Sequence, residues 1–157
     1  MKMAVVESWI EVPLRQFVDD AEVELALLLH PSGQVMAQHG FARAVDVMGA
    51  CALAAGIHAT ATELGRLVDD QPFRGMHHVG IQRQIFIAEA RSPRGAYIFL
   101  TVFGPESSLG LVRLYFDELA TALAAASPTD TTENPPALAE HFERDLNRSL
   151  AALFGRA

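Results

Sequence analysis

Side chains able to carry out covalent or metal chemistry are few and widely separated in this sequence. Cys51 is the one cysteine, and no histidine and asparagine accompany it in a spacing recognisable from cysteine hydrolases. His77 and His78 are adjacent, so in a strand they would point to opposite faces and could not hold one metal ion together. The other histidines lack an HExxH or CxxC companion. We therefore expect no catalytic residue, no metal site and no bound cofactor.

The basic side chains bear on nucleotide chemistry. Lys2 is the only lysine, so the chain lacks the interior Gly-Lys-Ser/Thr of a P-loop and cannot itself be a P-loop GTPase or ATPase. Arg91 and Arg94 lie in a predicted turn, where an arginine finger could reach the phosphates of a partner's nucleotide. Ser107 and Ser108 lack the G-x-S-x-G surroundings of a nucleophile, and we expect them to cap a helix.

Composition limits the classes of partner. The chain has 157 residues, of which 50% are hydrophobic and 20% charged, as in a globular domain. Its net charge of -7 argues against nucleic acid and anionic membranes as partners. No apolar run approaches the roughly 18 residues of a membrane span, and the N-terminus does not read as a signal peptide. We therefore expect a cytoplasmic protein that does not insert into membranes.

Hydrophobic periodicity predicts groups of helices and strands in alternation. The short connections within each group of strands imply antiparallel pairing. The expected fold is an α/β sandwich, in which a five-stranded antiparallel sheet carries helices on both faces. Helices are expected over residues 9–21, 44–68 and 109–126, and strands over 23–30, 34–40, 73–80, 81–90 and 95–103.

Three of these segments carry readable core patterns. The strand 23–30 is apolar on both faces, so we place it centrally in a sheet covered on both sides. Its predicted faces are Val23, Leu25, Leu27 and Leu29 on one side and Ala26 and Leu28 on the other. The expected core stripes of the outer helices are Ile10, Leu14, Phe17 and Val18, and Val112, Phe116, Leu119 and Leu123.

The chain changes character after residue 126. The segment 127–136 is polar and proline-bearing and is predicted to be a linker. The residues after it, 137–157, are predicted to form an amphipathic helix, which could dock on its own domain or reach a partner. Its apolar stripe is Leu138, Phe142, Leu146, Leu150 and Leu153.

The long helix 44–68 has two apolar faces. Helical spacing puts Ala50, Leu53, Ile57, Ala61, Leu64 and Val68 on the side expected to pack on the sheet. The opposite side carries Met48, Ala52, Ala55, Ala59 and Thr62, and no charged residue occurs between Met48 and Thr62. An apolar face directed away from the sheet indicates a partner. The alternative is that alanine is there only as a good helix former.

The order of elements, the hairpin VELALLLHPSGQVMAQHG and the final strand leading into FGPESSLGLVRLYFDELATAL resemble the Roadblock family, of the dynein light-chain roadblock type. The resemblance covers residues of about 9–126 as a Roadblock domain. Leu109-Gly110, Asn134-Pro135-Pro136 and the terminal segment are most similar to the bacterial MglB type. Proteins of that type are homodimers that bind the Ras-like GTPase MglA and raise its GTP hydrolysis without an arginine finger.

The resemblance implies a regulatory, non-enzymatic function in cell polarity or motility, and a homodimer in which the strand 73–80 pairs with its symmetry mate beside twin long helices. The expected dimer or GTPase interface is Met48, Ala52, Ala55, Gly56, Ala59, Thr62, Arg74, Met76, His77 and His78. Two alternatives remain open: a Roadblock adaptor that bridges polarity proteins without affecting hydrolysis, and a sensor of small molecules.

Overall fold

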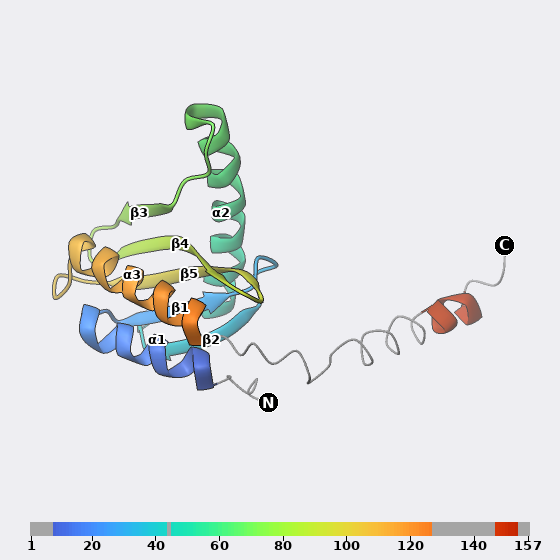
Figure 1. Cartoon of the computed structure of the whole chain (residues 1–157), viewed down its shortest axis with the longest axis horizontal. Helices are drawn as coiled ribbons and strands as arrows, with labels where there is room; N and C mark the ends of the chain where they lie inside the picture. The colour runs from blue at the N-terminus through green and yellow to red at the C-terminus, as the bar shows by residue number, and fades with distance from the viewer. Residues whose placement is uncertain (1–7, 44, 127–146, 154–157) are drawn as a thin grey trace. The chain divides into compact units, whose positions relative to one another are not determined.

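A computed structural model of the chain describes residues 8–43, 45–126 and 147–153. The chain divides into two compact units, Met1–Ser127 and Pro128–Ala157. The first unit contains three helices and five strands among its described residues (Figure 1). They follow in the order α1 (Ser8–Ala21), β1 (Leu25–Leu29), β2 (Val35–Gly40), α2 (Val47–Asp69), β3 (Gly75–Val79), β4 (Gln84–Ser92), β5 (Gly95–Phe103) and α3 (Leu109–Ala126).

The strands form one antiparallel sheet in the order β2-β1-β5-β4-β3. β2 and β3 are its edges, and β1 lies inside it with all five residues buried. The expected five-stranded sheet and the interior position of β1 are therefore confirmed. The register of β1 with β5 sets Leu27 opposite Leu100, and both side chains are buried.

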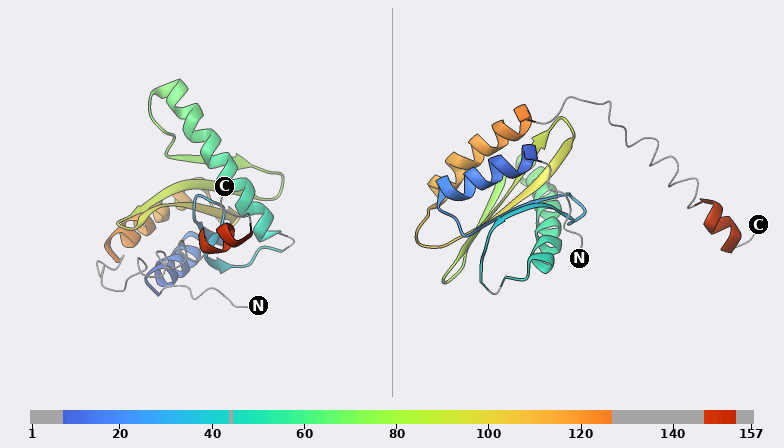
Figure 2. Two further views of the ribbon diagram at one scale, coloured as in Figure 1. Left: turned by 90° about the vertical axis from the view of Figure 1, so that its right-hand side faces the viewer. Right: turned by 90° about the horizontal axis from the view of Figure 1, so that it is seen from below.

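Helices cover both faces of the sheet, as expected for an α/β sandwich (Figure 2). α1 and α3 lie side by side on one face, and their predicted stripes are buried there. On the other face, α2 covers a second core cluster that includes Leu25, Leu27 and Leu29 of β1. Val23 was predicted on that face too. It belongs instead to the cluster under α1 and α3, because it precedes the strand and follows a turn in which Glu22 has φ 54°.

The ends of the elements follow local chemistry. Asp46 caps α2, since its carboxylate accepts a hydrogen bond from the Gly49 backbone N–H, and Asp70 ends the helix in the left-handed conformation. Ser108 caps α3 by accepting from the Leu111 N–H at 3.2 Å, while Ser107 donates to the Ala21 carbonyl. β4 begins at Gln84 rather than at Ile81, because residues 80–83 form the turn from β3, closed by a bond from Gly80 N–H to the Arg83 carbonyl.

The predicted sheet side of the long helix is partly right: Ala61 is buried, and Ala50 and Ile57 pack against the core cluster below the helix. The other three residues assigned to that side need correction. The buried residues of α2 are Cys51, Ala54, Ala61 and Gly65, whereas Leu53, Leu64 and Val68, expected on the sheet, are 70%, 50% and 70% exposed. The real buried face is rotated toward Cys51 and Ala54. The buried side of α2 is thus made of small side chains, and most of its larger apolar residues lie on the exposed side.

Candidate functional site

The outer face of α2 is exposed and mostly apolar, and toward its C-terminal end it also carries the exposed ion pair between Arg66 and Glu63. Ala52 and Ala59, predicted on this face, are exposed, as is Gly56 of the expected interface, and Met48 is 81% exposed. Ala55 and Thr62 are half-buried, and Ala55 packs against the core cluster below the helix. The structure adds Leu53, Leu64, Leu67 and Val68 to this exposed set. We call the exposed residues Met48, Ala52, Leu53, Gly56, Ala59, Leu64, Leu67 and Val68 the outer face of α2.

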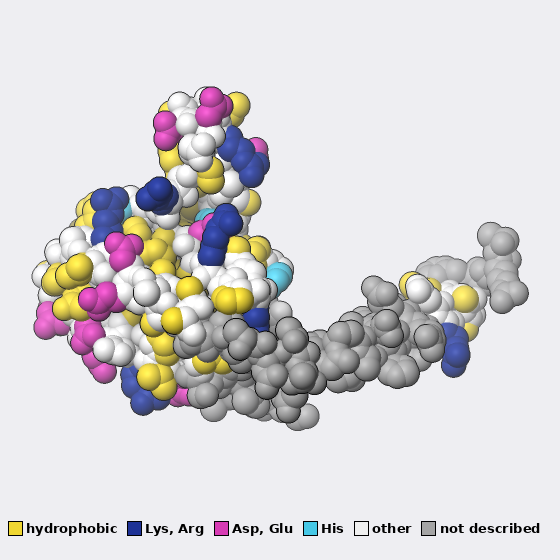
Figure 3. All heavy atoms as spheres, viewed as in Figure 1, with side chains coloured by type: hydrophobic (Ala, Val, Ile, Leu, Met, Phe, Trp, Pro, Cys, Tyr) yellow, Lys and Arg dark blue, Asp and Glu magenta, His cyan; other side chains and the backbone are white. Residues whose placement is uncertain are grey.

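The C-terminal half of α2 extends past the edge of the sheet (Figures 1 and 2). In the space-filling view this end of the helix stands clear of the surface below it (Figure 3). It is held chiefly by the segment that follows: Gly65 lies so close to Phe73 that a Cβ there would be 2.7 Å from the Phe73 nitrogen. A helix end with exposed Leu64, Leu67 and Val68 and few contacts of its own is suited to packing against another chain.

A wide open hollow of about 1180 Å³ lies between the projecting part of α2, the segment 71–74, β4 and α3. Thr62 and Arg74 line it, and Arg74 is exposed. The charges that line it are balanced: three are arginines and three are carboxylates, namely Arg66, Arg74, Arg91, Asp69, Glu89 and Asp117. A hollow this open would bury little of a small ligand, so it is better suited to a protein segment.

β3 borders this region as an edge strand. It pairs with β4 on one side, from Gly75 opposite Ala88 to Val79 opposite Gln84, and has no paired strand on the other side among the described residues. Met76 is half-buried on the α2 side, opposite Ile87. An open strand edge is a template for pairing with another chain unless it is covered.

The two adjacent histidines of β3 lie on opposite faces of the sheet, as the strand alternation requires. His77 is half-buried, stacks on Phe103 with ring centroids 6.0 Å apart, and shares a hydrogen bond of 2.7 Å with Gln84 Oε1 through its Nε2. His78 is exposed. No group of three or more metal-ligating side chains occurs among the residues that the structure describes.

Apolar side chains are also exposed where β3 turns into β4. Val79 is 73% exposed, and Ile81, within the turn, is fully exposed. The turn is fixed by Arg83, which forms an ion pair with Glu24 and donates a hydrogen bond to the Arg43 carbonyl. Val79 and Ile81 therefore form a second exposed apolar surface, at the end of β3, which the sequence pattern did not predict.

Arg91 and Arg94, the two candidates for an arginine finger, both contact neighbouring side chains of this chain. Arg91 forms an ion pair with Glu89 at 3.0 Å, and the Arg94 guanidinium lies 5.8 Å from the centre of the Trp9 ring. Both therefore contribute to the surface at the β4–β5 turn. Cys51 is completely buried among apolar residues, and this burial raises the pKa of its thiol, as expected for a small core residue.

The C-terminal segment is described only over residues 147–153, which are helical. Leu150 and Leu153, two members of its predicted stripe, are 43% and 77% exposed. Leu138, Phe142 and Leu146 lie outside the described residues. The two leucines thus present an apolar surface within their own unit.

The expectation that no segment is long and apolar enough to span a membrane does not hold for α2. By length and composition alone, α2 is long and apolar enough to cross a membrane. It is the one such helix in the described part of the chain. One such helix is weak evidence for a membrane span; only 17% of this stretch is buried, although Cys51 and Ala54 of α2 pack on the sheet.

Neither a scan of protein-family models nor a comparison with curated protein sequences gives a match. Solved structures do match. Myxococcus xanthus MglB superposes with a TM-score of 0.67 at 22% identity, over 75% of this chain and 94% of that one. The gliding protein MglB of Thermus thermophilus gives 0.68 at 22% identity, over 80% and 93%. A Roadblock/LC7 domain from Streptomyces avermitilis gives 0.59 at 21% identity, over 74% and 92%.

These similarities show that the chain has the Roadblock fold and that its structure resembles MglB, as the sequence resemblance implied. The chain spans nearly the whole length of each of the three structures. At identities near 20% the similarity establishes the fold, and the activity has to be argued from the surfaces described above.

Proposed function

We propose that this chain is a homodimeric, non-enzymatic regulator that binds a Ras-like small GTPase of the MglA type and stimulates its GTP hydrolysis without supplying an arginine finger. The observation that carries the proposal is the outer face of α2, which is mostly apolar, exposed and extends past the sheet on a Roadblock fold resembling MglB. The cytoplasm is the proposed place of action, where such a GTPase would meet it, and polarity or motility is the proposed process.

The first step of the proposal is the dimer. β3 is an open edge, and antiparallel pairing of two β3 strands across a two-fold axis would satisfy its free backbone groups and make one continuous sheet. The projecting half of α2 would then lie over the second copy, which would cover Leu64, Leu67 and Val68. Met76, His77, His78 and Arg74 would lie at or beside the seam, together with Ala52, Gly56 and Ala59 where the two helices approach.

The ends of β3 fit this arrangement. β3 covers residues 75–79, so pairing about its centre, His77, would bring the start of one strand beside the end of the other. Phe73 precedes the strand and Ile81 follows it, and both are exposed. In the proposed dimer each apolar end would cover the other, which supports pairing with a second copy rather than with an unrelated strand.

The second step is the action on the GTPase. A surface that binds the GTP-bound switch conformation more tightly than the alternatives shifts the GTPase toward that state, and only by the difference between its affinities. The GTPase's own catalytic groups would then be held in place for hydrolysis. Arg91 and Arg94 are engaged with Glu89 and Trp9, which supports a mechanism without an arginine finger.

The C-terminal segment provides the third element of the proposal. We assign residues 9–126 to the Roadblock domain, 127–136 to a linker and 137–157 to an amphipathic helix that contacts the GTPase. Leu150 and Leu153 are exposed and available for such a contact. Deletion of residues 128–157 is expected to weaken GTPase binding while leaving the dimer intact.

The deciding experiment measures GTP turnover by a purified MglA-type GTPase with and without this chain. We expect stimulation by the wild type, loss of stimulation in Leu67→Arg, which places a charge on the outer face of α2, and no loss in Val12→Arg on α1. Leu67 and Val12 are both exposed apolar residues on helices, so the second variant controls for surface charge. The double variant Arg91→Ala/Arg94→Ala should stimulate as the wild type does.

The same experiment separates the alternative functions. Binding of the GTPase without any change in turnover would favour the adaptor function and contradict the proposed stimulation. If the wild type stimulates GTP turnover and the arginine double variant binds the GTPase without stimulating it, an arginine-finger mechanism would be supported instead. A monomeric wild type at micromolar concentration in sedimentation would refute the dimer.

A further inference from the structure

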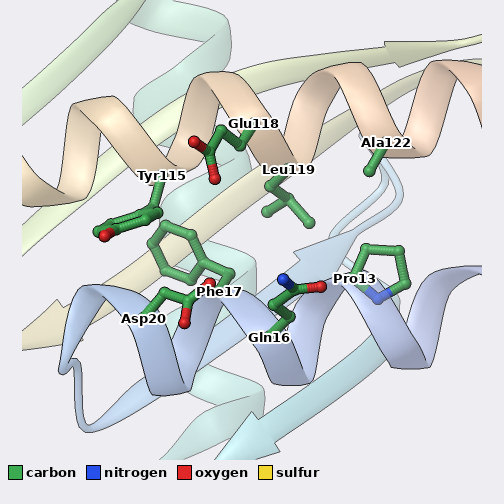
Figure 4. Close-up of a pocket in the computed structure, with 8 residues that line it drawn as sticks. All are labelled: Pro13, Gln16, Phe17, Asp20, Tyr115, Glu118, Leu119 and Ala122. Carbon is green, nitrogen blue, oxygen red and sulfur yellow. The ribbon is translucent and has the colours of Figure 1, made fainter.

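A second recessed surface lies on the opposite side of the sheet from α2, between α1 and α3 (Figure 4). The two helices run antiparallel there, with Pro13 opposite Ala122 and Asp20 opposite Tyr115. Phe17 and Leu119 are buried and form the apolar base. We call this surface the α1–α3 groove. Neither the proposed dimer nor the proposed contact of α2 with a GTPase uses it.

The volume of the groove limits what it can hold. It encloses about 210 Å³, which is below the roughly 300–1,000 Å³ of sites for small organic ligands. The groove is open to solvent along one side, so one long side chain can lie in it while its backbone stays outside. The occupant that fits is therefore a side chain of a protein segment lying along the two helices.

The charge of the groove specifies that side chain. Figure 4 shows the carboxylates of Asp20, on α1, and Glu118, on α3, at its two walls. Neither carboxylate forms an ion pair or side-chain hydrogen bond with another residue in the described part of the chain. Acidic side chains also gather on the surface where α1 ends and α3 begins (Figure 3). A cation placed between the two carboxylates would be attracted by both.

Apolar side chains continue the groove in both directions. Helical spacing places Leu111 in line with Tyr115, and Leu114 one turn before Glu118. At the other end, Val12 lies one turn before Gln16. Val12 and Leu114 are more than half exposed. A segment docking here would meet acidic groups at the centre of its footprint and apolar groups on either side.

We infer that the α1–α3 groove docks a segment of a partner protein that inserts an arginine between Asp20 and Glu118, with apolar residues on either side of that arginine. The stem of the arginine packs on Phe17 and Leu119, and its charged group lies beside the Tyr115 ring. Arginine fits better than lysine, because its planar guanidinium has five donors and can bind two carboxylates that come from different helices.

The test uses the full chain and a synthetic alanine-based helical peptide with one central arginine and leucines one turn to either side. The matched control peptide carries citrulline, a neutral analogue of arginine, at the same place. We expect the arginine peptide to bind roughly tenfold more tightly, since only it makes charge-assisted contacts. Backbone amide resonances of α1 and α3 around the groove should shift on binding, and those of α2 and β3 should not.

Variants of the chain complete the test. Asp20→Asn/Glu118→Gln should remove the preference for arginine over citrulline, while Asp117→Asn, at a carboxylate on the other side of α3, should keep it. Equal affinity for the two peptides, or resonance shifts confined to α2 and β3, would overturn the inference. So would a wild-type chain that binds the peptide only after deletion of residues 128–157, because the occupant would then be the chain's own C-terminal segment.

Discussion

The Arg83 guanidinium joins three segments that are distant in the sequence. Its Nε lies 2.9 Å from Glu24 Oε2, and its Nη1 donates to the Arg43 carbonyl at 2.8 Å. Glu24 Oε2 is buried and has no well-aligned hydrogen bond, so the contact with Arg83 is ionic. One side chain therefore ties the turn between β3 and β4 to the start of β1 and to the segment before α2.

Removing this side chain should loosen the turn. Arg83→Met is expected to lower the free energy of unfolding by about 1 kcal/mol, because both side chains of the ion pair are 36% exposed and solvent weakens their attraction. Arg15→Met breaks the more exposed pair between Arg15 and Glu11 on α1 and should cost only about 0.3 kcal/mol. Urea unfolding measures both, and equal losses would show that Arg83 does no more than an ordinary surface pair.

The projecting end of α2 depends on a glycine. A Cβ on Gly65 would lie 2.7 Å from both the Gln71 carbonyl oxygen and the Phe73 nitrogen, and these are backbone atoms that cannot turn aside. We expect Gly65→Ala to destabilise the protein by about 1–3 kcal/mol despite the higher helix propensity of alanine. Gly56→Ala is the control, since a Cβ there meets no atom within 4 Å.

In the monomer, Gly56→Ala should raise the free energy of unfolding by about 0.5–1 kcal/mol. Thermal or urea unfolding at concentrations that keep the chain monomeric separates this effect from dimerisation. A Gly65→Ala variant as stable as the wild type would show that the segment 71–73 moves away easily, and the end of α2 would then not be held by it.

The proposed pairing of β3 strands can be tested by cross-linking. In the chain with Cys51→Ala, the double variant Phe73→Cys/Ile81→Cys is expected to form disulfides between copies, because pairing about His77 brings residue 73 of one copy beside residue 81 of the other. Each copy would contribute both ends, so the product on a non-reducing gel is a covalent dimer. A matched pair on α1, Val12→Cys/Arg15→Cys, should stay monomeric; a dimer from both pairs, or from neither, contradicts the pairing.

Cys51 makes stability depend on pH in the alkaline range. Burial raises the pKa of its thiol, so the folded chain keeps this proton at a pH where the unfolded chain, with an ordinary thiol pKa of about 8.5, has lost it. The contribution of the thiol is therefore complete at neutral pH and falls as pH rises through that range. Cys51→Ala should be less stable at neutral pH, because it leaves a small cavity, but should lose less stability than the wild type as the pH rises.

Urea unfolding at neutral and alkaline pH measures how steeply the free energy of unfolding falls with pH in the wild type and in Cys51→Ala. The native thiol should also react with iodoacetamide far more slowly than the unfolded one, since only the exposed thiolate is a good nucleophile. A wild type and a Cys51→Ala variant with the same pH slope would show that the thiol does not titrate differently on folding.

Local patterns predicted most of the fold because they were unambiguous. The stripes of α1 and α3 contain large apolar residues, such as Phe17 and Phe116, at helical spacing between charged ones, so their buried faces could be read directly. β1 is apolar on both faces, which indicated a strand covered on both sides. The start of β4 was placed too early, because an isoleucine in a turn looks like the first residue of a strand.

The orientation of α2 could not be read in the same way. Alanine occurs all around this helix, so its periodicity does not distinguish a face packed on the sheet from a face left open. The size and apolar character of Leu53 and Leu64 predict that they face the sheet, but Cys51 and Ala54 lie in the core cluster below α2 instead. The α1–α3 groove could not be predicted from the sequence either, since Asp20 and Glu118 are distant along the chain and each resembles an ordinary surface carboxylate.

The sequence by itself therefore determined the order of the elements, the interior position of β1 and the absence of a P-loop lysine, because each depends on residue type and short-range spacing. Only the tertiary structure decided which side of α2 is open, that its end extends past the β3 edge, and that Arg83 fixes the turn carrying Ile81. These features arise from contacts between segments far apart in the chain, and such contacts depend on how closely whole elements can pack.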